Sequence, residues 1–241
     1  MHSHTRYSIP TYVFISLSCA AIAVFCAEHS TSSNAAGADT LPLASPRYDG
    51  AMSVAEAIYS RKSVRNFKQK SIPFQAMSQL LWAAGGKTVD GVSGATRSYP
   101  SAGGLYPLEI YLVCKEVDSI AAGVYRYEWN SHSLTGIKSG DLIDSLKQTT
   151  YSGSLKSTFV PACIVITADY SKTALKYGDR GADRYVPMDA GGSAQNVYLQ
   201  ARALGIATWP IGAFDDTGVK KVLGIDDSEQ VPLCIIPCGK L

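Results

Sequence analysis

Residues 188–214 read "MDAGGSAQNVYLQARALGIATWPIGAF", the stretch in which the longest predicted helix of the chain runs directly into a strand. The helix spans 188–205 and carries small residues in its first half, so that another group can approach it closely. Residues 206–214 read as a strand that leads into a loop. The elements on either side of this stretch decide the fold class.

The rest of the chain mixes helices and strands without a regular alternation. A helix is predicted over 53–63, with Ser53 as its N-cap and Glu56 three residues on. A second helix has Pro73 in its first turn and stops at Gly85 and Gly86. Strands are expected at 108–116, 161–170 and 231–239, a hairpin over 123–137, short helices at 141–150 and 215–224, and a long loop at 87–104. This order favours an α+β fold over a doubly wound sheet.

The composition indicates one globular domain, with no internal repeat, over 46–241. The 241 residues are 46% hydrophobic and 17% charged, which is enough apolar material for a core. The formal net charge is only +2. Nucleic acid is therefore not expected as a partner, because that function usually requires a strongly basic face.

The first 38 residues differ from the domain. Arg6 is followed by an uncharged apolar run at 11–27 and by a polar, small-residue stretch at 28–40. This is the pattern of a secretory signal, with "AGA" at 36–38 as a cleavage site before Asp39. An uncleaved membrane anchor is the alternative. We therefore assign 1–38 to a signal peptide or N-terminal anchor plus linker and expect an exported or membrane-anchored, periplasmic-type protein, or a cytoplasmic one if the segment is not used.

Cysteines and histidines give no sign of a metal site. The domain has one histidine, His132, and its cysteines lie in or beside apolar runs, where a free thiol behaves as a small hydrophobe. The spacing in "CIIPC" at 234–238 matches no common zinc or redox motif. Neither a histidine metal site nor a catalytic triad is predicted.

Positive charge is concentrated in "RKSVRNF" at 61–67. Arg61 and Arg65 are able to grip a phosphate with two hydrogen bonds each, Lys62 adds a point charge, and Ser63 offers a hydroxyl. The stretch is read either as such an anion site or as the polar end of a helix.

A second motif, "PSAGGLYPLEIYL" at 100–112, places Gly103 and Gly104 beside Ser101. The glycines would let the backbone approach a flat ligand, although a plain glycine loop is the alternative. No P-loop and no strand-linked dinucleotide-binding fingerprint is present.

A third motif begins at Lys176 and Tyr177, two side chains able to exchange protons. Arg180 and Arg184 lie four apart and are expected to share one helix face. They are read as site residues or as a solvated face paired with Asp179 and Asp183. Gln195 and Asn196 are read as inward-pointing amides or as core amides bonded to the backbone.

Six stretches in order together resemble the flavin-dependent nitroreductase superfamily, specifically its SagB-type, thiazole/oxazole-forming dehydrogenase branch. The resemblance covers nearly the whole chain after residue 50. The stretches are "RKSVRNF", "LLWAAGG", "PSAGGLYPLEIYLV", "GVYRYE", the run from Leu175 to Asp216, and "PLCIIPCGK".

The resemblance implies an α+β three-layer sandwich, with a central, mostly antiparallel sheet flanked by helices, in an intertwined homodimer that binds FMN at the subunit interface. The phosphate and ribityl chain would be held by Arg61, Lys62, Ser63 and Arg65, with Lys240 as a second cation. Pro100, Ser101, Gly103 and Gly104 would line the isoalloxazine ring from the partner subunit. Gly212 and Ala213 would present backbone N–H groups to its N5 and O4 edge.

The chemistry implied by the resemblance is hydride transfer between flavin N5 and a small organic substrate. Lys176 and Tyr177 match the catalytic Lys-Tyr pair of azoline-oxidising members. A reductase that uses NADH or NADPH as electron donor on nitro- or quinone-like compounds is the second enzymatic reading. The alternative from another class is an exported flavin- or nucleotide-binding protein without turnover.

Overall fold

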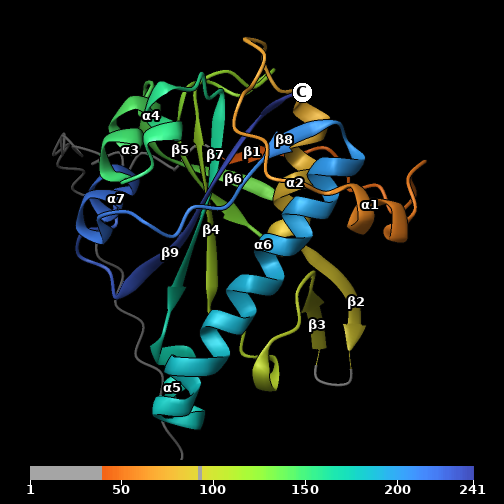
Figure 1. The fold of residues 1–241 in the computed structure, drawn as a ribbon. Coiled ribbons are helices and arrows are strands. Elements are labelled where there is room, and N and C mark those ends of the chain that lie inside the picture. Colours follow the sequence, from red (N-terminus) through yellow and green to blue (C-terminus); the bar gives the residue numbers. More distant parts are fainter. Residues whose placement is uncertain (1–39, 92–93) are drawn as a thin grey trace, which may run out of the picture. The chain divides into compact units, whose positions relative to one another are not determined.

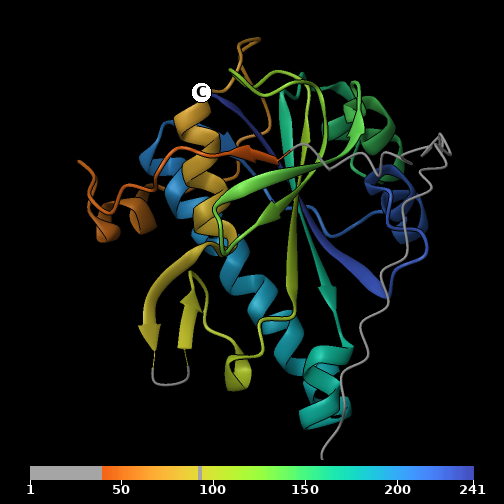
Figure 2. The same ribbon diagram turned by 180° about the vertical axis from the view of Figure 1, so that it is seen from behind.

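The computed structural model describes residues 40–91 and 94–241 (Figures 1 and 2), so the predicted signal or anchor segment lies outside the described residues. The helices are α1 (Val54–Ser60), α2 (Phe74–Gly85), α3 (Ile143–Thr149), α4 (Gly153–Ser157), α5 (Ser171–Tyr177), α6 (Val186–Ala203) and α7 (Asp216–Leu223), with a 3-10 turn, η1 (Ala102–Gly104), and a π-helix, η2 (Gly181–Tyr185). The strands are β1 (Thr40–Pro42), β2 (Lys87–Gly91), β3 (Gly94–Arg97), β4 (Leu108–Cys114), β5 (Gly123–Glu128), β6 (Ser133–Ser139), β7 (Ala162–Asp169), β8 (Ile206–Thr208) and β9 (Gln230–Lys240).

A seven-stranded sheet in the order β1-β6-β5-β4-β7-β9-β8 forms the centre of the domain. Every neighbouring pair in this sheet is antiparallel. The expected α+β class with an antiparallel central sheet is therefore confirmed. The sheet begins with β1, which pairs with β6 and lies upstream of the expected domain start at residue 46.

Helices cover both faces of this sheet, and the alternation of side chains along β4 and β7 explains why. Ile110 and Leu112 face a core shared with α2 and α6, whereas Tyr111 and Val113 face a second core shared with α3 and α7. Successive strand residues point to opposite faces, so strands that are apolar throughout require cover on both sides. The three-layer arrangement is visible in Figures 1 and 2.

Local capping fixes several helix ends where the sequence predicted them. The Ser53 hydroxyl accepts from the Glu56 N–H at 3.1 Å, and α2 ends at Gly85 with Gly86 as its cap. Asp215 caps α7 through the N–H groups of Thr217 and Gly218, and Gly224 ends that helix in the left-handed conformation.

Three segments differ from the sequence prediction. Helix α1 ends at Ser60, so the basic stretch that follows is extended rather than helical. The predicted loop 87–104 contains the β2–β3 hairpin, which its glycine and serine content hid. Arg180 and Arg184 do not lie in one regular α-helix, because Arg180 precedes η2 and Arg184 lies inside it. Both are exposed and form no ion pair with the described acidic residues.

Within residues 40–91 and 94–241, no helix has both the length and the apolar character needed to cross a membrane. The apolar run at 11–27, which carries the expectation of export or anchoring, lies outside this range.

Candidate functional site

The basic stretch lies beside β8, the edge strand, and beside the C-terminal end of β9. After α1, Arg61 adopts an extended conformation, and the Val64 N–H donates to the Thr208 carbonyl of β8 at 3.2 Å. The Lys68 N–H donates to the Lys240 carbonyl at 3.0 Å, and Lys240 pairs with Ile206 of β8. These backbone bonds place the segment that carries Arg61, Lys62 and Arg65 along the adjoining ends of β8 and β9, and we call these three residues together with Lys240 the cation cluster.

Tyr198 of α6 contacts two residues of the basic stretch. Its hydroxyl lies 2.6 Å from the Ser63 hydroxyl, and the Arg61 guanidinium lies over its ring at 4.8 Å from the centroid. None of the four cations forms an ion pair with an acidic side chain in the described part of the chain. A small pocket of about 30 Å³ opens here, lined by residues that include Arg61, Lys62 and Tyr198. Unpaired cations beside a hydroxyl have the chemistry of an anion site.

The loop that contains Pro100, Ser101, Gly103 and Gly104, which we call the PSAGG loop, contacts the opposite end of α6. The Ser101 hydroxyl donates to Asp189 Oδ2 at 2.5 Å and accepts from the Tyr106 N–H at 3.0 Å. Gly103 and Gly104 have φ values of 64° and 66°, so the backbone there favours glycine. Burial raises the pKa of Asp189, although hydrogen bonds from Ser101 and the Ala102 N–H oppose this rise.

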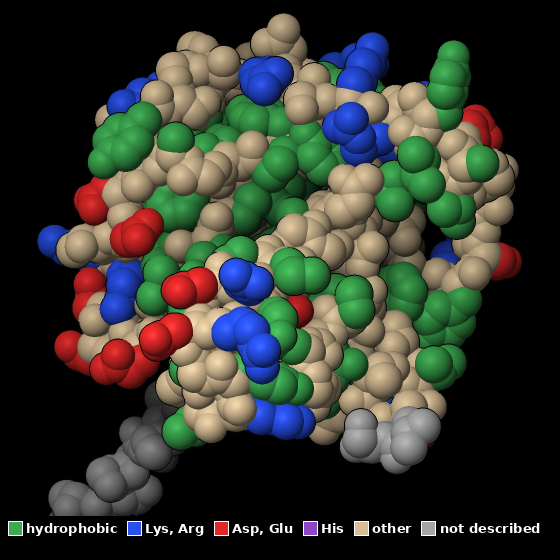
Figure 3. Space-filling model, turned by 60° about the horizontal axis from the view of Figure 1, so that its bottom comes forward, with side chains coloured by type: hydrophobic (Ala, Val, Ile, Leu, Met, Phe, Trp, Pro, Cys, Tyr) green, Lys and Arg blue, Asp and Glu red, His purple; other side chains and the backbone are tan. Residues whose placement is uncertain are grey.

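Lys176 and Tyr177, at the end of α5, lie against this loop. A Cβ atom built on Gly103 would lie 2.6 Å from the Tyr177 hydroxyl and 2.8 Å from Lys176 Nζ. The Lys176 ammonium is 5.3 Å from the Tyr177 ring centroid, and the Tyr177 ring makes an edge contact with Tyr185 at 5.2 Å. The structure thus joins two motifs that are far apart in the sequence. A view that brings the α5 end forward shows a hollow with hydrophobic side chains inside it and Lys and Arg side chains on its rim (Figure 3).

Gly212 and Ala213 lie in the segment after β8, next to the end of α3. The Ala213 carbonyl accepts from the Tyr151 N–H at 3.0 Å, and Phe214 bridges Thr150. Both residues are exposed, and their own N–H groups donate no hydrogen bond to the described residues. Two adjacent free donors are therefore available to a bound molecule.

The cation cluster and the PSAGG loop contact opposite ends of α6 (Figure 1). The nine residue steps from Asp189 to Tyr198 correspond to about 13.5 Å of helix rise. One chain therefore carries the predicted site residues in separate groups rather than in one closed pocket.

Two residues at these groups were not predicted from the sequence, Asp189 and Tyr198. Both are buried on α6 and bond to partners that are 88 and 135 positions away along the chain. Their signal in the sequence is weak, since a single acid and a single tyrosine in a helix are common. Asn196 donates to the Ser98 carbonyl at 2.6 Å, whereas Gln195 is exposed.

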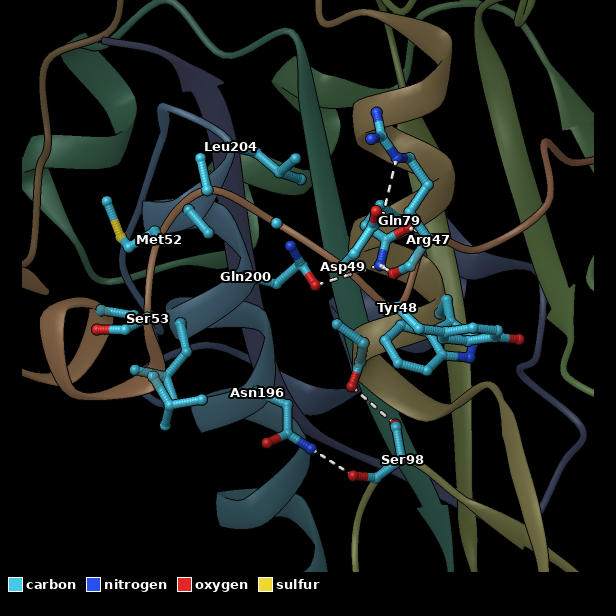
Figure 4. Close-up of a pocket in the computed structure, with 18 of the residues that line it drawn as sticks. Arg47, Tyr48, Asp49, Met52, Ser53, Gln79, Ser98, Asn196, Gln200 and Leu204 are labelled. Carbon is cyan, nitrogen blue, oxygen red and sulfur yellow. Dashed lines mark hydrogen bonds and ion pairs between the residues drawn. The ribbon is translucent and has the colours of Figure 1, made fainter.

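A larger cavity lies away from these groups. A groove of about 720 Å³ runs between residues 47–54, α2 and α6; Asn196 lines it, but none of the residues assigned to FMN or to catalysis does (Figure 4). Gln79 holds the backbone of Arg47 from both sides, accepting from its N–H at 2.8 Å and donating to its carbonyl at 2.9 Å. A large cavity alone does not identify the reactive site, and we assign the groove a different role below.

Comparison with known proteins finds one family. The sequence model described as "Nitroreductase family" matches residues 58–240. The protein named "Putative nitroreductase MJ1384" from Methanocaldococcus jannaschii is 34% identical over 84% of this chain and 98% of its own length. The crystal structure of "a putative nitroreductase" from Ralstonia eutropha JMP134 has a TM-score of 0.71 at 25% identity, covering 83% of this chain and 89% of that one.

A further similarity concerns the SagB-type branch of the superfamily. The "Microcin B17-processing protein McbC" of Escherichia coli is 28% identical over 58% of this chain, and the match spans about half of that protein, 52%. Together these similarities confirm the resemblance that rests on the six sequence stretches.

Proposed function

The chain belongs to the nitroreductase family of oxidoreductases, and we propose that it is an FMN-dependent enzyme that transfers a hydride between flavin N5 and a small organic substrate. The family typically binds flavin. In this proposal, the cation cluster binds the phosphate end of FMN, and the PSAGG loop and Gly212–Ala213 contact the ring end.

The observation that carries this proposal is the cation cluster. Its four cations lie on adjoining segments at the ends of β8 and β9 and have no acidic partner among the described residues, although the whole chain has a net charge of only +2. The FMN phosphate is a dianion, and arginine binds phosphate oxygens through two parallel N–H donors. The donor set therefore fits the phosphate end of this cofactor, with the Ser63 hydroxyl as a neutral donor beside it.

The ring end fits the exposed backbone of two segments. Gly103 and Gly104 are exposed and carry no side chains of their own, which suits contact of the loop backbone with a flat ring system. Gly212 and Ala213 would donate their free N–H groups to the polar edge of that ring. When bound, FMN supplies the hydride-accepting and hydride-donating atom N5.

Lys176 and Tyr177 are proposed to handle the proton. Lys176 Nζ lies beside the Gly103 backbone, where its neutral amine form would accept the proton released as a hydride leaves the substrate. Tyr177 would orient the lysine, since Lys176 Nζ lies near the Tyr177 ring and the Tyr177 hydroxyl lies against the same glycine.

We further propose that the active form is a homodimer, in which each FMN contacts both subunits. The pocket at the cation cluster is about 30 Å³, far below the roughly 300–1,000 Å³ typical of ligand sites. The small helix α1 exposes three large apolar side chains, Val54 (71%), Ile58 (57%) and Tyr59 (92%), next to the 720 Å³ groove that Val54 helps to line. Such a surface suits burial against a second copy of the chain.

Two substrate classes agree with the relatives. McbC is named for processing microcin B17, which favours oxidation of azolines in a peptide, whereas the longer match to MJ1384 favours reduction of nitro- or quinone-like compounds by NADH or NADPH. The second candidate function is an exported flavin- or nucleotide-binding protein without turnover. It is favoured by the uncharged apolar run at 11–27, which precedes the domain.

The experiment that separates these functions is absorbance spectroscopy of the purified chain with FMN. A bound-flavin spectrum that bleaches with NADH or NADPH and recovers with a quinone or nitro acceptor supports an enzyme of the reductase type. Bleaching by an azoline peptide supports the dehydrogenase type. A flavin spectrum that none of these reductants changes supports the binding protein, and the absence of any flavin complex contradicts the proposal.

A further inference from the structure

A buried carboxyl group that the proposed chemistry leaves unused lies directly behind the PSAGG loop. Asp189, in the first turn of α6, is only 5% exposed and forms no ion pair with the described basic residues. Its Oδ2 accepts from the Ser101 hydroxyl at 2.5 Å, and the Ala102 N–H also donates to this carboxyl. Burial of a carboxylate is unfavourable unless donors satisfy it, and both donors here come from the loop.

These bonds hold the loop in a conformation that it would not adopt freely. Ser101 Oγ accepts from the Tyr106 N–H at 3.0 Å, and the Ser101 carbonyl accepts from the Gly104 N–H at 3.0 Å. Between them, the backbone passes through three left-handed residues, including Tyr106 at φ 48°. A left-handed conformation costs a non-glycine residue about 1–2 kcal/mol, so the turn needs support from outside itself.

The turn positions Gly103 against the Lys-Tyr pair. A Cβ atom at Gly103 would lie within 3 Å of both the Tyr177 hydroxyl and Lys176 Nζ, so a small displacement of the loop changes this contact. The chain of contacts therefore runs from Asp189 through Ser101 and Ala102 to Gly103, and from Gly103 to Lys176 and Tyr177.

We propose that Asp189 is a positioning residue, which fixes the PSAGG loop through Ser101 and Ala102 and so sets where Lys176 and Tyr177 lie relative to that loop. The catalytic consequence rests on the proposed function, because it assumes that the loop and the Lys-Tyr pair flank the flavin. The positioning of the loop by Asp189 does not rest on the proposed function, since it concerns only contacts within this chain.

The test compares Asp189→Asn, Ser101→Ala and the double variant in the full chain, with Asp183→Asn as the control. Asp183 is an exposed aspartate in the preceding π-helix, so its variant makes the same change of charge without touching the loop. The first readout is hydrogen exchange of the amides in 99–106 without added flavin. We expect both single variants to exchange about 10-fold faster or more, the effect of losing a hydrogen bond to a charged group. We expect the effects of the two substitutions to be less than additive in the double variant, because both weaken or remove the bond between Ser101 and Asp189.

The second readout is steady-state kinetics with FMN. For Asp189→Asn we expect kcat to fall about 10-fold or more while the Kd for FMN stays within about 3-fold, because misplacement of catalytic groups affects turnover and the cation cluster is unchanged. If wild-type chain binds no FMN, the proposed function fails, and the exchange data alone then decide the positioning role. Unchanged exchange in Asp189→Asn, or fully additive effects of Asp189→Asn and Ser101→Ala, overturns the inference.

Discussion

The hydroxyl groups of Ser63 and Tyr198 lie 2.6 Å apart and join the basic stretch to the C-terminal half of α6. The same tyrosine ring supports the Arg61 guanidinium, which lies 4.8 Å from its centroid. One buried aromatic residue therefore holds two of the proposed phosphate ligands in place. This makes Tyr198 the best position at which to disturb the site without removing a charge.

Replacement of Tyr198 by Phe should weaken FMN binding by about 2- to 10-fold, the range expected for the loss of one hydrogen bond. The ring and its contact with Arg61 remain, so the fold should be kept. Tyr198→Ala should weaken binding further, because it also removes the cation–π contact. Titration of each variant with FMN, followed by flavin fluorescence, measures the effect. Equal affinity of wild type and both variants would contradict a role for Tyr198 in this site.

Replacement of Lys176 by Ala should lower kcat by about 100-fold or more, because a positioned acid–base group typically contributes that much. FMN should remain bound, since the cation cluster lies at the other end of α6. Lys172→Ala is the matched control: Lys172 lies one turn earlier on α5 and pairs with Glu109 at 2.8 Å on the surface. Surface pairs contribute about 1 kcal/mol or less, so the control should keep its activity. Normal turnover in Lys176→Ala would remove this residue from the mechanism.

Replacement of Gly103 by Ala should reduce kcat by about 10- to 100-fold, because the added methyl group would displace the Lys176 and Tyr177 side chains. The control is Gly205→Ala, since Gly205 has a similar φ of +68° and no atom lies within 4 Å of where its added methyl group would be. Both variants carry the same backbone strain, and only Gly103→Ala creates the contact. Stopped-flow or steady-state assays should thus separate the two, and equal losses would show that strain alone is responsible.

His132 should make stability depend on pH. Its Nδ1 lies 2.7 Å from the Tyr127 hydroxyl and its Nε2 lies 2.9 Å from the Ala44 carbonyl, and burial lowers its pKa below the usual value of 6.5. The unfolded chain therefore binds more protons than the fold between the two pKa values. The stabilisation is complete above about pH 6.5 and declines as the pH falls below it.

Urea denaturation of wild type and His132→Asn at several pH values measures this pH dependence of the free energy of unfolding. Asparagine tolerates the positive φ of 49° at this position, so the substitution removes the titrating group with little added strain. The difference in the free energy of unfolding between the two proteins should shrink as the pH is lowered. A difference that does not vary with pH would refute the role of His132.

The sequence predicted the fold because its apolar patterns are strong and local. Residues 161–170 are apolar on both faces, and only a strand with cover on both sides explains that pattern. The stop at Gly85–Gly86 and the cap at Ser53 likewise depend on neighbours within a few positions. The β2–β3 hairpin was missed because two short polar strands rich in glycine carry no such pattern.

The candidate site was predicted only in part, for a related reason. The basic stretch and the PSAGG loop have local compositions typical of ligand-binding segments, so the sequence alone indicates their residues as candidates. Asp189 and Tyr198 act through partners far away in the sequence, so only the packing of α6 reveals them. The contact of Gly103 with Lys176 and Tyr177 similarly depends on how α5 meets the loop.

The most direct test of the FMN site is the affinity of Arg61→Ala for FMN beside that of wild type and Lys70→Ala. Lys70 is an exposed lysine on the same segment and controls for the loss of one positive charge. A hydrogen bond to a charged group contributes about 1.5–3 kcal/mol, so Arg61→Ala should bind FMN about 10- to 100-fold more weakly, with an unchanged far-UV circular dichroism spectrum. Wild type and Lys70→Ala should bind alike. If Arg61→Ala binds FMN as tightly as wild type, or if wild type binds none, the proposed phosphate site is wrong.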